Sequence, residues 1–307
     1  MLTKSKLKKL KRFFPWQKPK SVDEDPTALE RVRTIMNSPG YIMAEEDINF
    51  LQQRDTMGNR LNLDYLKAEL LLQEYGIEQT IVVFGSTRIV EKKTAETEVK
   101  EAQKVLRASP DSLEAIKALN IAERVSDKSR FYEIARQFGQ IVGKAGRGPS
   151  DSRLTLMTGG GPGIMEAANR GSFDVGAKSI GLNISLPHEQ FPNPYITPEL
   201  CFQFHYFAIR KLHFLQRAKA LVVFPGGFGT IDELFDVLTL IQTGKMEIIP
   251  IVLVGQNYWE KLFNMEFLED EGVIDSVDLS LFIYAETAAN IWQAILDWYD
   301  NNSELSL

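Results

Sequence analysis

Short apolar runs alternate with helix-forming segments from residue 79 almost to the end of the chain, and few folds accommodate this alternation. The run at residues 79–86, which Gly85 and Ser86 end, predicts the first strand. Further strands are predicted at 154–158, 179–184, 220–224 and 248–254, with a weaker sixth at 281–284. Helices are predicted at residues 163–173, 199–217, 230–243, 258–271 and 287–300. The pattern predicts an α/β fold in which a doubly wound, Rossmann-like parallel sheet has helices on both faces.

Two helical regions lie outside this alternation. Residues 27–75 have a helical pattern that ends at Gly76, with a turn expected near Gly40, and they predict an N-terminal helical extension of the core. Residues 91–144 are highly charged and predict an inserted antiparallel pair of helices separated at Pro110. With this insertion, the Rossmann-like nucleotide-binding core is expected to span residues 76–301.

The net charge of −6 conceals an asymmetry along the chain. Residues 1–20 contain eight Lys or Arg and no acid, whereas the remainder has 27 basic against 41 acidic residues. Nucleic acid is therefore not expected to be a main partner, because an acidic surface repels a phosphate backbone. Residues 1–26 are expected to be a basic, disordered tail, and weak contact with an anionic membrane surface is the alternative.

Several classes of protein are disfavoured by what the sequence lacks. It has no signal-peptide pattern and no apolar run long enough to cross a membrane, so a cytoplasmic protein is expected. The single cysteine, Cys201, excludes an intrachain disulfide. Three scattered histidines give no metal-site spacing, and no metal is expected.

The strand predicted at 220–224 ends abruptly in a proline and three glycines, directly before a predicted helix. Such a turn leaves backbone N–H groups uncovered and directs the positive end of the helix toward a ligand, which favours phosphate binding. The candidate phosphate ligands are Gly226, Gly227, Gly229 and Thr230. Thr230 and Glu233 also match a capping box, which would give that pair a purely structural role.

Two other predicted strands end in glycine-bearing turns. These turns contain Gly85 and Ser86 after the first strand, and Gly159, Gly160, Gly161 and Gly163 after the second. Because ligands of doubly wound sheets lie beyond the carboxyl ends of the strands, the three turns are expected to converge on one nucleotide site. The second loop lacks the last glycine of the dinucleotide fingerprint, and Gly244-Lys245 lies outside any P-loop pattern, which disfavours NAD and ATP.

Three segments carry a resemblance to a known family. Gly159-Gly-Gly-Pro-Gly-Ile-Met165, Arg210-Lys211, and the Pro-Gly-Gly-x-Gly-Thr-x-x-Glu run at 225–233 resemble the LOG ("Lonely Guy") family of nucleoside 5'-monophosphate phosphoribohydrolases, which include enzymes of cytokinin ribotides. The resemblance covers roughly residues 80–298, and the pieces at 186–190 and 193–195 resemble its longer members. Residues 1–75 and 91–144 have no counterpart in the short members.

The resemblance implies a chemistry and assigns residues to it. Cleavage of an N-glycosidic bond passes through an oxocarbenium-like ribose, which needs a nearby carboxylate and a positioned water. Glu233 is expected to supply the carboxylate and Arg210 to hold the phosphate or ribose, without a metal or organic cofactor. Lys211 and Glu166 are further candidate substrate contacts. The structural alternatives are a solvated helix face for the pair Arg210 and Lys211, and an acid favoured by the helix dipole in the first turn for Glu166.

A non-catalytic carrier is the alternative to an enzyme. Related Rossmann-like proteins with similar glycine loops include binders of the molybdenum cofactor. Because a fold does not determine a function, this chain could be a non-catalytic carrier of a nucleotide or of that cofactor. Lysine decarboxylase is disfavoured, because no lysine stands in a pyridoxal-phosphate context. The LOG resemblance also implies a homodimer or larger homo-oligomer, with the helix predicted at 199–217 as a candidate interface.

Overall fold

The computed structural model describes residues 20–145, 154–187 and 191–302. The chain divides into two compact units, Met1–Asn62 and Leu63–Leu307, and the boundary falls inside a helix. The predicted tail at 1–26 lies mostly outside the described residues, as do residues 188–190 of the predicted family segment at 186–190.

The described part of the N-terminal unit consists of helices and 3-10 turns, as the helical pattern of residues 27–75 predicts. They are α2 (Ala28–Met36), the 3-10 turns η2 (Pro39–Tyr41) and η3 (Arg54–Thr56), α3 (Ile48–Leu51) and the start of α4 (Met57–Glu74). Asp47 caps α3 by accepting a hydrogen bond from the Phe50 N–H. Gly76, with a φ of 63°, follows the end of α4, and the predicted turn at Gly40 lies within η2.

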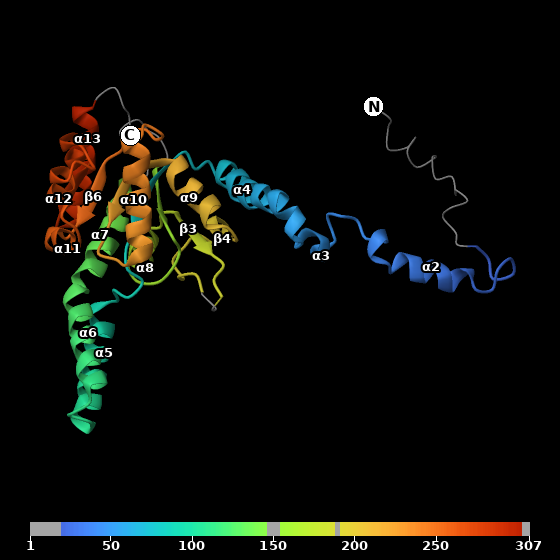
Figure 1. The fold of residues 1–307 in the computed structure, drawn as a ribbon, viewed down its shortest axis with the longest axis horizontal. Helices are drawn as coiled ribbons and strands as arrows, with labels where there is room; N and C mark the ends of the chain where they lie inside the picture. The colour runs from blue at the N-terminus through green and yellow to red at the C-terminus, as the bar shows by residue number, and fades with distance from the viewer. Residues whose placement is uncertain (1–19, 146–153, 188–190, 303–307) are drawn as a thin grey trace. The chain divides into compact units, whose positions relative to one another are not determined.

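The larger unit is built on a seven-stranded sheet, in which all neighbouring strands are parallel (Figure 1). The strands are β1 (Gln79–Phe84), β2 (Leu154–Thr158), β3 (Ser179–Ile184), β4 (Cys201–Phe204), β5 (Ala218–Val223), β6 (Ile251–Val254) and β7 (Phe282–Ala285). Their spatial order is β4-β3-β2-β1-β5-β6-β7. The order reverses between β1 and β5, so the predicted doubly wound fold is confirmed.

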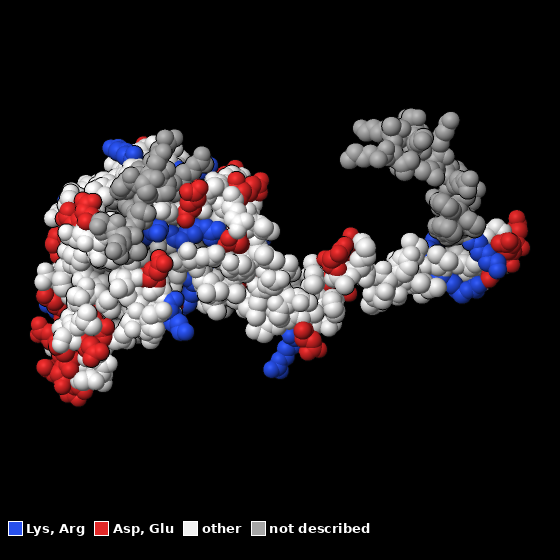
Figure 2. All heavy atoms as spheres, turned by 90° about the horizontal axis from the view of Figure 1, so that it is seen from above, with Lys and Arg blue, Asp and Glu red and all other residues white. Residues whose placement is uncertain are grey.

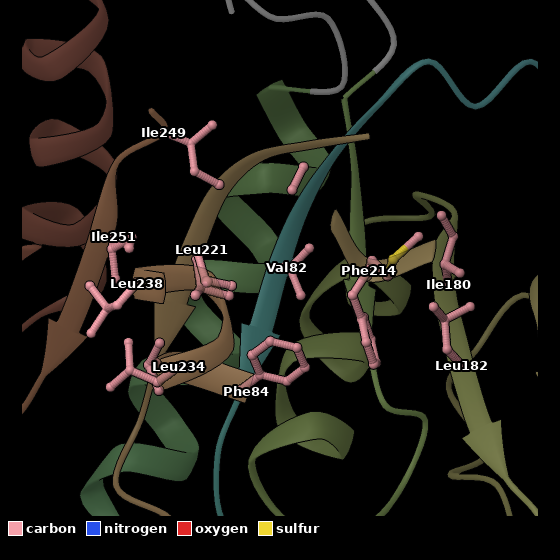
Figure 3. Close-up of a cluster of buried hydrophobic side chains, with 14 of the residues drawn as sticks. Val82, Phe84, Ile180, Leu182, Phe214, Leu221, Leu234, Leu238, Ile249 and Ile251 are labelled. Carbon is pink, nitrogen blue, oxygen red and sulfur yellow. The ribbon is translucent and has the colours of Figure 1, made fainter. Parts of the chain in front are cut away.

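Helices cover both faces of this sheet because alternate residues of each strand point to opposite sides. Val82 and Phe84 of β1 pack with buried side chains of α4, α9 (Phe207–Gln216), α10 (Phe228–Gln242) and α11 (Gln256–Leu262). Figure 3 shows this cluster, with Leu234 and Leu238 of α10 facing the strands. Ile81 and Val83 pack on the other side with α7 (Arg130–Ala145), α8 (Ile164–Asp174) and α13 (Ala288–Asn301).

The α-helix predicted at 199–217 is wrong over its first eight residues. The structure has a 3-10 turn, η4 (Pro198–Leu200), then β4, and α9 begins only at Phe207. In β4, Phe202 and Phe204 are buried while Gln203 is exposed, which is the alternation of an edge strand. The four residues are too few for this period to stand out in the sequence.

Residues 91–144 contain three helices instead of the predicted pair. They are α5 (Lys92–Ala108), α6 (Leu113–Lys128) and α7, and the break between α5 and α6 contains Pro110, as predicted. α7 buries Phe131, Ala135 and Phe138 against the sheet, so it is a core helix and not part of an insertion. The sequence between α10 and β7 also holds two helices, α11 and α12 (Met265–Asp270), where one was predicted at 258–271.

The surface agrees with the acidic composition of the chain beyond its first residues. Acidic side chains gather at one end of the larger unit in the view of Figure 2, whereas Lys and Arg are scattered. None of the helices in the described ranges has the length and apolarity that crossing a membrane requires.

Candidate functional site

A cavity of about 480 Å³ opens at the carboxyl ends of β1, β2 and β5, on the two sides of the point where the strand order reverses. Eight of the sequence-predicted site residues line it. These are Gly85, Ser86, Gly159, Arg210, Gly227, Gly229, Thr230 and Glu233. Three glycine turns far apart in the sequence therefore meet at one cavity.

Backbone contacts fix the position of the central turn, which follows β1. The Ser86 N–H donates to the Pro225 carbonyl at 3.0 Å, and the Ser86 carbonyl accepts from the Ile164 N–H at 3.1 Å. A Cβ on Gly85 would lie 2.6 Å from the Ile164 side chain, so glycine is required for α8 to approach this closely. The turns after β1 and β5 and the start of α8 are thus held as one rigid group.

The helix after β5 starts earlier than the capping-box reading requires. Gly227 is the N-cap of α10 and makes no side-chain cap bond, so Thr230 and Glu233 lie inside the helix. The capping-box alternative is therefore wrong, because a box would need Thr230 at the N-cap position. The first turn of α10 contains Phe228, Gly229 and Thr230, and its N-terminal end borders the cavity.

Glu233 is a buried carboxylate held between two cations. Only 5% of the residue is exposed, and its Oε1 lies 3.6 Å from Arg210 Nη2 while its Oε2 lies 3.3 Å from Lys211 Nζ. Burial raises the pKa of Glu233 above its ordinary value, and the charges of Lys211 and Arg210 oppose this rise. The cavity thus contains a carboxylate whose protonation depends on its neighbours.

Arg210 and Lys211 are adjacent on α9 but have different surroundings. Arg210 lines the cavity, packs against the rings of Phe207 and Phe214, and has a buried Nε without a hydrogen-bond partner among the described residues. Lys211 is not part of the cavity lining, and it pairs with three carboxylates of α10, those of Asp232, Glu233 and Asp236. The solvated-face alternative thus fails for Arg210, whose side chain is 14% exposed.

Six predicted site residues do not line the cavity, and Lys211 is one of them. The others are Gly160, Gly161, Gly163, Glu166 and Gly226. Glu166 accepts a hydrogen bond from the Tyr132 hydroxyl at 2.8 Å, which joins α8 to α7. The carbonyls of Gly160 and Gly161 accept hydrogen bonds from Asn193, so the outer part of this loop is occupied by contacts within the protein.

Gly226 and Gly163 support the turns from behind the cavity. A Cβ on Gly226 would lie 2.1 Å from Thr230 Oγ1, and one on Gly163 would lie 2.4 Å from the Ser86 carbonyl oxygen. Gly163 also has a φ of 74°, which other residues rarely adopt. Both glycines therefore shape the cavity without lining it.

Sequence reasoning missed six residues that line the cavity. They are Phe84, Thr87, Arg88, Met165, Phe214 and Phe228. Phe214 lies one helical turn after Arg210, so the i, i+4 rule could have placed it on the same face. Thr87 and Arg88 directly follow the predicted Gly85-Ser86 turn, and this position in the sequence is the feature that could have predicted their place in the cavity lining.

A family model and two known proteins match parts of this chain. Residues 165–295 match the family model described as "Possible lysine decarboxylase". The chain is 27% identical over 146 residues to the "Probable cytokinin riboside 5'-monophosphate phosphoribohydrolase LOG4" of Oryza sativa, covering 46% of this chain and 62% of that protein. It is 25% identical over 158 residues to the "Cytokinin riboside 5'-monophosphate phosphoribohydrolase LOG1" of Arabidopsis thaliana. That match covers 50% of this chain and 72% of that protein.

Two solved structures are similar at 18% identity. The X-ray structure of the structural genomics target TM1055 has a TM-score of 0.42 and covers 71% of this chain and 99% of its own. The structure of the molybdenum cofactor binding protein of Rippkaea orientalis has a TM-score of 0.36, and the match covers 54% of this chain and 86% of that chain.

Proposed function

The chain belongs to the LOG family, and from this premise we propose that it hydrolyses the N-glycosidic bond of nucleoside 5'-monophosphates such as AMP or cytokinin ribotides. The products are the free base and ribose 5-phosphate. The match spans 62% of the rice relative's length, and we propose the substrate together with the reaction.

The observation that carries this proposal is the Glu233 carboxylate, buried beside Arg210 at a cavity bordered by three glycine turns. A cavity that only bound a phosphate would gain nothing from a carboxylate, because the two repel each other. A ribosyl cation that forms as the bond to the base breaks is stabilised by a nearby carboxylate. The pairing of Arg210 with Glu233 therefore favours glycoside cleavage over simple anion binding.

Each group has a distinct role in the proposed reaction. The N-terminal end of α10, with Gly227, Gly229 and Thr230, holds the 5'-phosphate through backbone N–H groups and a hydroxyl. Glu233 stabilises the cation at C1' and orients the water whose oxygen bonds to that carbon. The electrons of the broken C–N bond stay with the base, which takes up a proton, and Arg210 holds the phosphate or ribose in the reactive geometry.

Two alternatives predict different outcomes. A carrier of a nucleotide or of the molybdenum cofactor would bind its ligand without releasing a base. A decarboxylase that uses a lysine Schiff base needs a neutral amine. No lysine lines the cavity in the described structure, and Lys211 lies next to it, paired with Glu233. Burial lowers the pKa of Lys211, but its bond to Asp232 and the charge of Glu233 outweigh burial and raise this pKa overall.

The test is base release from AMP by the wild type and by Glu233→Gln. We expect the variant to keep its thermal melting temperature and to lose at least a hundredfold in turnover, a loss of about 2.7 kcal/mol in transition-state stabilisation. Adenosine should be a far poorer substrate than AMP, because the turns favour an anion. Near wild-type turnover by Glu233→Gln, or binding of AMP without base release by the wild type, would refute the proposal.

A further inference from the structure

We propose that a second cavity, of about 620 Å³, binds a ligand bearing several phosphate groups. The cavity lies between the end of α6, the start of α7 and α11, at the carboxyl end of β6. Arg124, Lys128, Arg130 and Lys261 line it together with a single acid, Asp127. None of these residues lines the candidate active site.

The concentration of positive charge there is unusual for this protein, whose net charge is −6. The carboxylates that offset it are Asp127 in the lining and Glu286, which lies 3.6 Å from Arg130 Nη2. Both partners of that pair are at least half exposed, so the pair is weak. The cavity therefore keeps an excess of cations over acids.

The position of Arg130 within its helix argues for a ligand. Lys128 and Lys261 lie in the last turns of α6 and α11, where a cation is favoured by the helix dipole alone. Arg130 is the first residue of α7, where the dipole disfavours a cation. An anion in the cavity would attract Arg130 and the N-terminal end of α7 together.

The distribution of these groups indicates the class of ligand. The cations come from three helices around one cavity, so a ligand with phosphate groups spread over its length contacts more of them than a single phosphate does. The volume is within the range of small-molecule sites. Inorganic tripolyphosphate contains the required charge and is a suitable probe.

One residue connects this cavity to the candidate active site. Tyr258 lines the second cavity, and its hydroxyl donates a 2.6 Å hydrogen bond to the carbonyl of Gly226 in the turn after β5. A ligand that moves Tyr258 therefore acts on the turn proposed to hold the substrate phosphate. This consequence rests on the proposed function, whereas the binding site does not.

The test is calorimetric titration of the full-length protein with tripolyphosphate at about 0.15 M salt, with excess ribose 5-phosphate present to occupy the active site. The triple variant Arg124→Gln, Lys128→Gln, Lys261→Gln is compared with Lys104→Gln, Lys117→Gln, Lys245→Gln, in which three exposed lysines elsewhere lose the same charge. We expect at least a tenfold loss of affinity in the first and less than twofold in the second. No binding by the wild type, or equal losses in both variants, would overturn the proposal.

A second measurement tests whether ligand binding at this cavity changes the activity at the candidate active site. Tripolyphosphate should change the KM of the wild type for AMP at least twofold beyond its effect on the cavity variant, whose active site is intact. If affinity depends on the cavity cations but both proteins respond equally in turnover, the site stands and its coupling through Tyr258 is rejected. If neither protein hydrolyses AMP, the proposed function fails while the binding result still decides the site.

Discussion

Burying the carboxylate of Glu233 lowers the stability of the folded protein. A carboxylate that is 5% exposed has lost most of its hydration, and contacts of 3.3 and 3.6 Å with two cations compensate only in part, since its pKa remains raised. An apolar residue at this position of α10 would pack without that penalty. A protein that retains such a group has a use for its charge, which is why Glu233 is the centre of the proposed mechanism.

The protonation of Glu233 gives a prediction about pH. Activity that needs the carboxylate falls as the pH drops through the pKa of Glu233, which lies above the 4.5 of a free glutamate. Lys211 lowers this pKa and Asp232 raises it. The acid limb of the kcat/KM profile for AMP should therefore move to higher pH in Lys211→Met and to lower pH in Asp232→Asn.

The opposite signs of these two shifts are the control for general damage to the site, which would lower rates without moving the limb in two directions. Shifts of the same sign, or an unmoved limb in both variants, would show that another group titrates.

Gly226 provides a prediction about the shape of the turn. A Cβ there would lie 2.1 Å from Thr230 Oγ1, so Gly226→Ala must displace Thr230 and should destabilise the protein by about 1–3 kcal/mol. Nothing lies within 4 Å of a Cβ on Gly227, whose φ of −96° alanine adopts easily. Denaturant unfolding of the two variants should therefore separate them clearly, and equal stabilities would contradict the close packing of Thr230 on Gly226.

At the scale of elements, α7 and α8 touch through their backbones. A Cβ on Gly171 of α8 would lie 2.0 Å from the Arg136 carbonyl oxygen, and one on Gly139 of α7 would lie 2.1 Å from that of Ala168. Carbonyl groups within helices cannot rotate away, so an added methyl must push the helices apart. The start of α8 contacts the Gly85-Ser86 turn, so this packing also positions the cavity.

Gly171→Ala should accordingly cost about 3 kcal/mol of stability, measured by denaturant unfolding. The matched control is Gly58→Ala in α4, where nothing lies within 4 Å of the added Cβ and alanine is the better helix former. If Gly171→Ala is as stable as Gly58→Ala, the two helices are not in backbone contact.

The elements also show what the sequence could and could not predict. β2 and β3 have the predicted bounds because their apolar runs are buried on both faces, and they are followed by a glycine-rich turn after β2 and by Ser185, Leu186 and Pro187 after β3. β4 was not predicted, because four residues between helix-forming segments are too few to show the alternation of buried and exposed residues that marks a strand. α7 was assigned to an insertion because it follows the charged helices α5 and α6 without a clear break, although Phe131, Ala135, Phe138 and Val142 have the spacing of a buried helix face.

The candidate site was predictable where glycine marks the end of a strand. Gly85, Gly159 and Gly227 meet at the cavity as parallel strand ends must, but their separation in sequence hid which side chains fill the space between them. Phe214 and Met165 reach the cavity from helices, and Lys211 turns to the acids of α10 instead. These outcomes depend on how the helices rotate on the sheet, which local patterns do not encode.

At the scale of the whole molecule, every structural part of the candidate site lies in the larger unit. The buried residues of the two core clusters all lie between Ala68 and Tyr299, and the cavity lining lies between Phe84 and Glu233. Glu69 of α4 forms a bidentate pair with Arg217, at 2.9 and 2.7 Å, which attaches the second half of α4 to this unit. Of the described residues before α4, none belongs to the two core clusters or to the cavity lining.

A chain that begins at Met57, the first residue of α4, should therefore fold and hydrolyse AMP with a kcat/KM within about twofold of the full-length value, if catalysis lies in the larger unit as proposed. Light scattering on both proteins tests the predicted homodimer at the same time. A truncated dimer with full activity would assign both assembly and catalysis to the larger unit. A truncated monomer with full activity would remove the dimer from the mechanism, and an inactive but folded monomer would mean that residues before Met57 assemble a site shared between subunits.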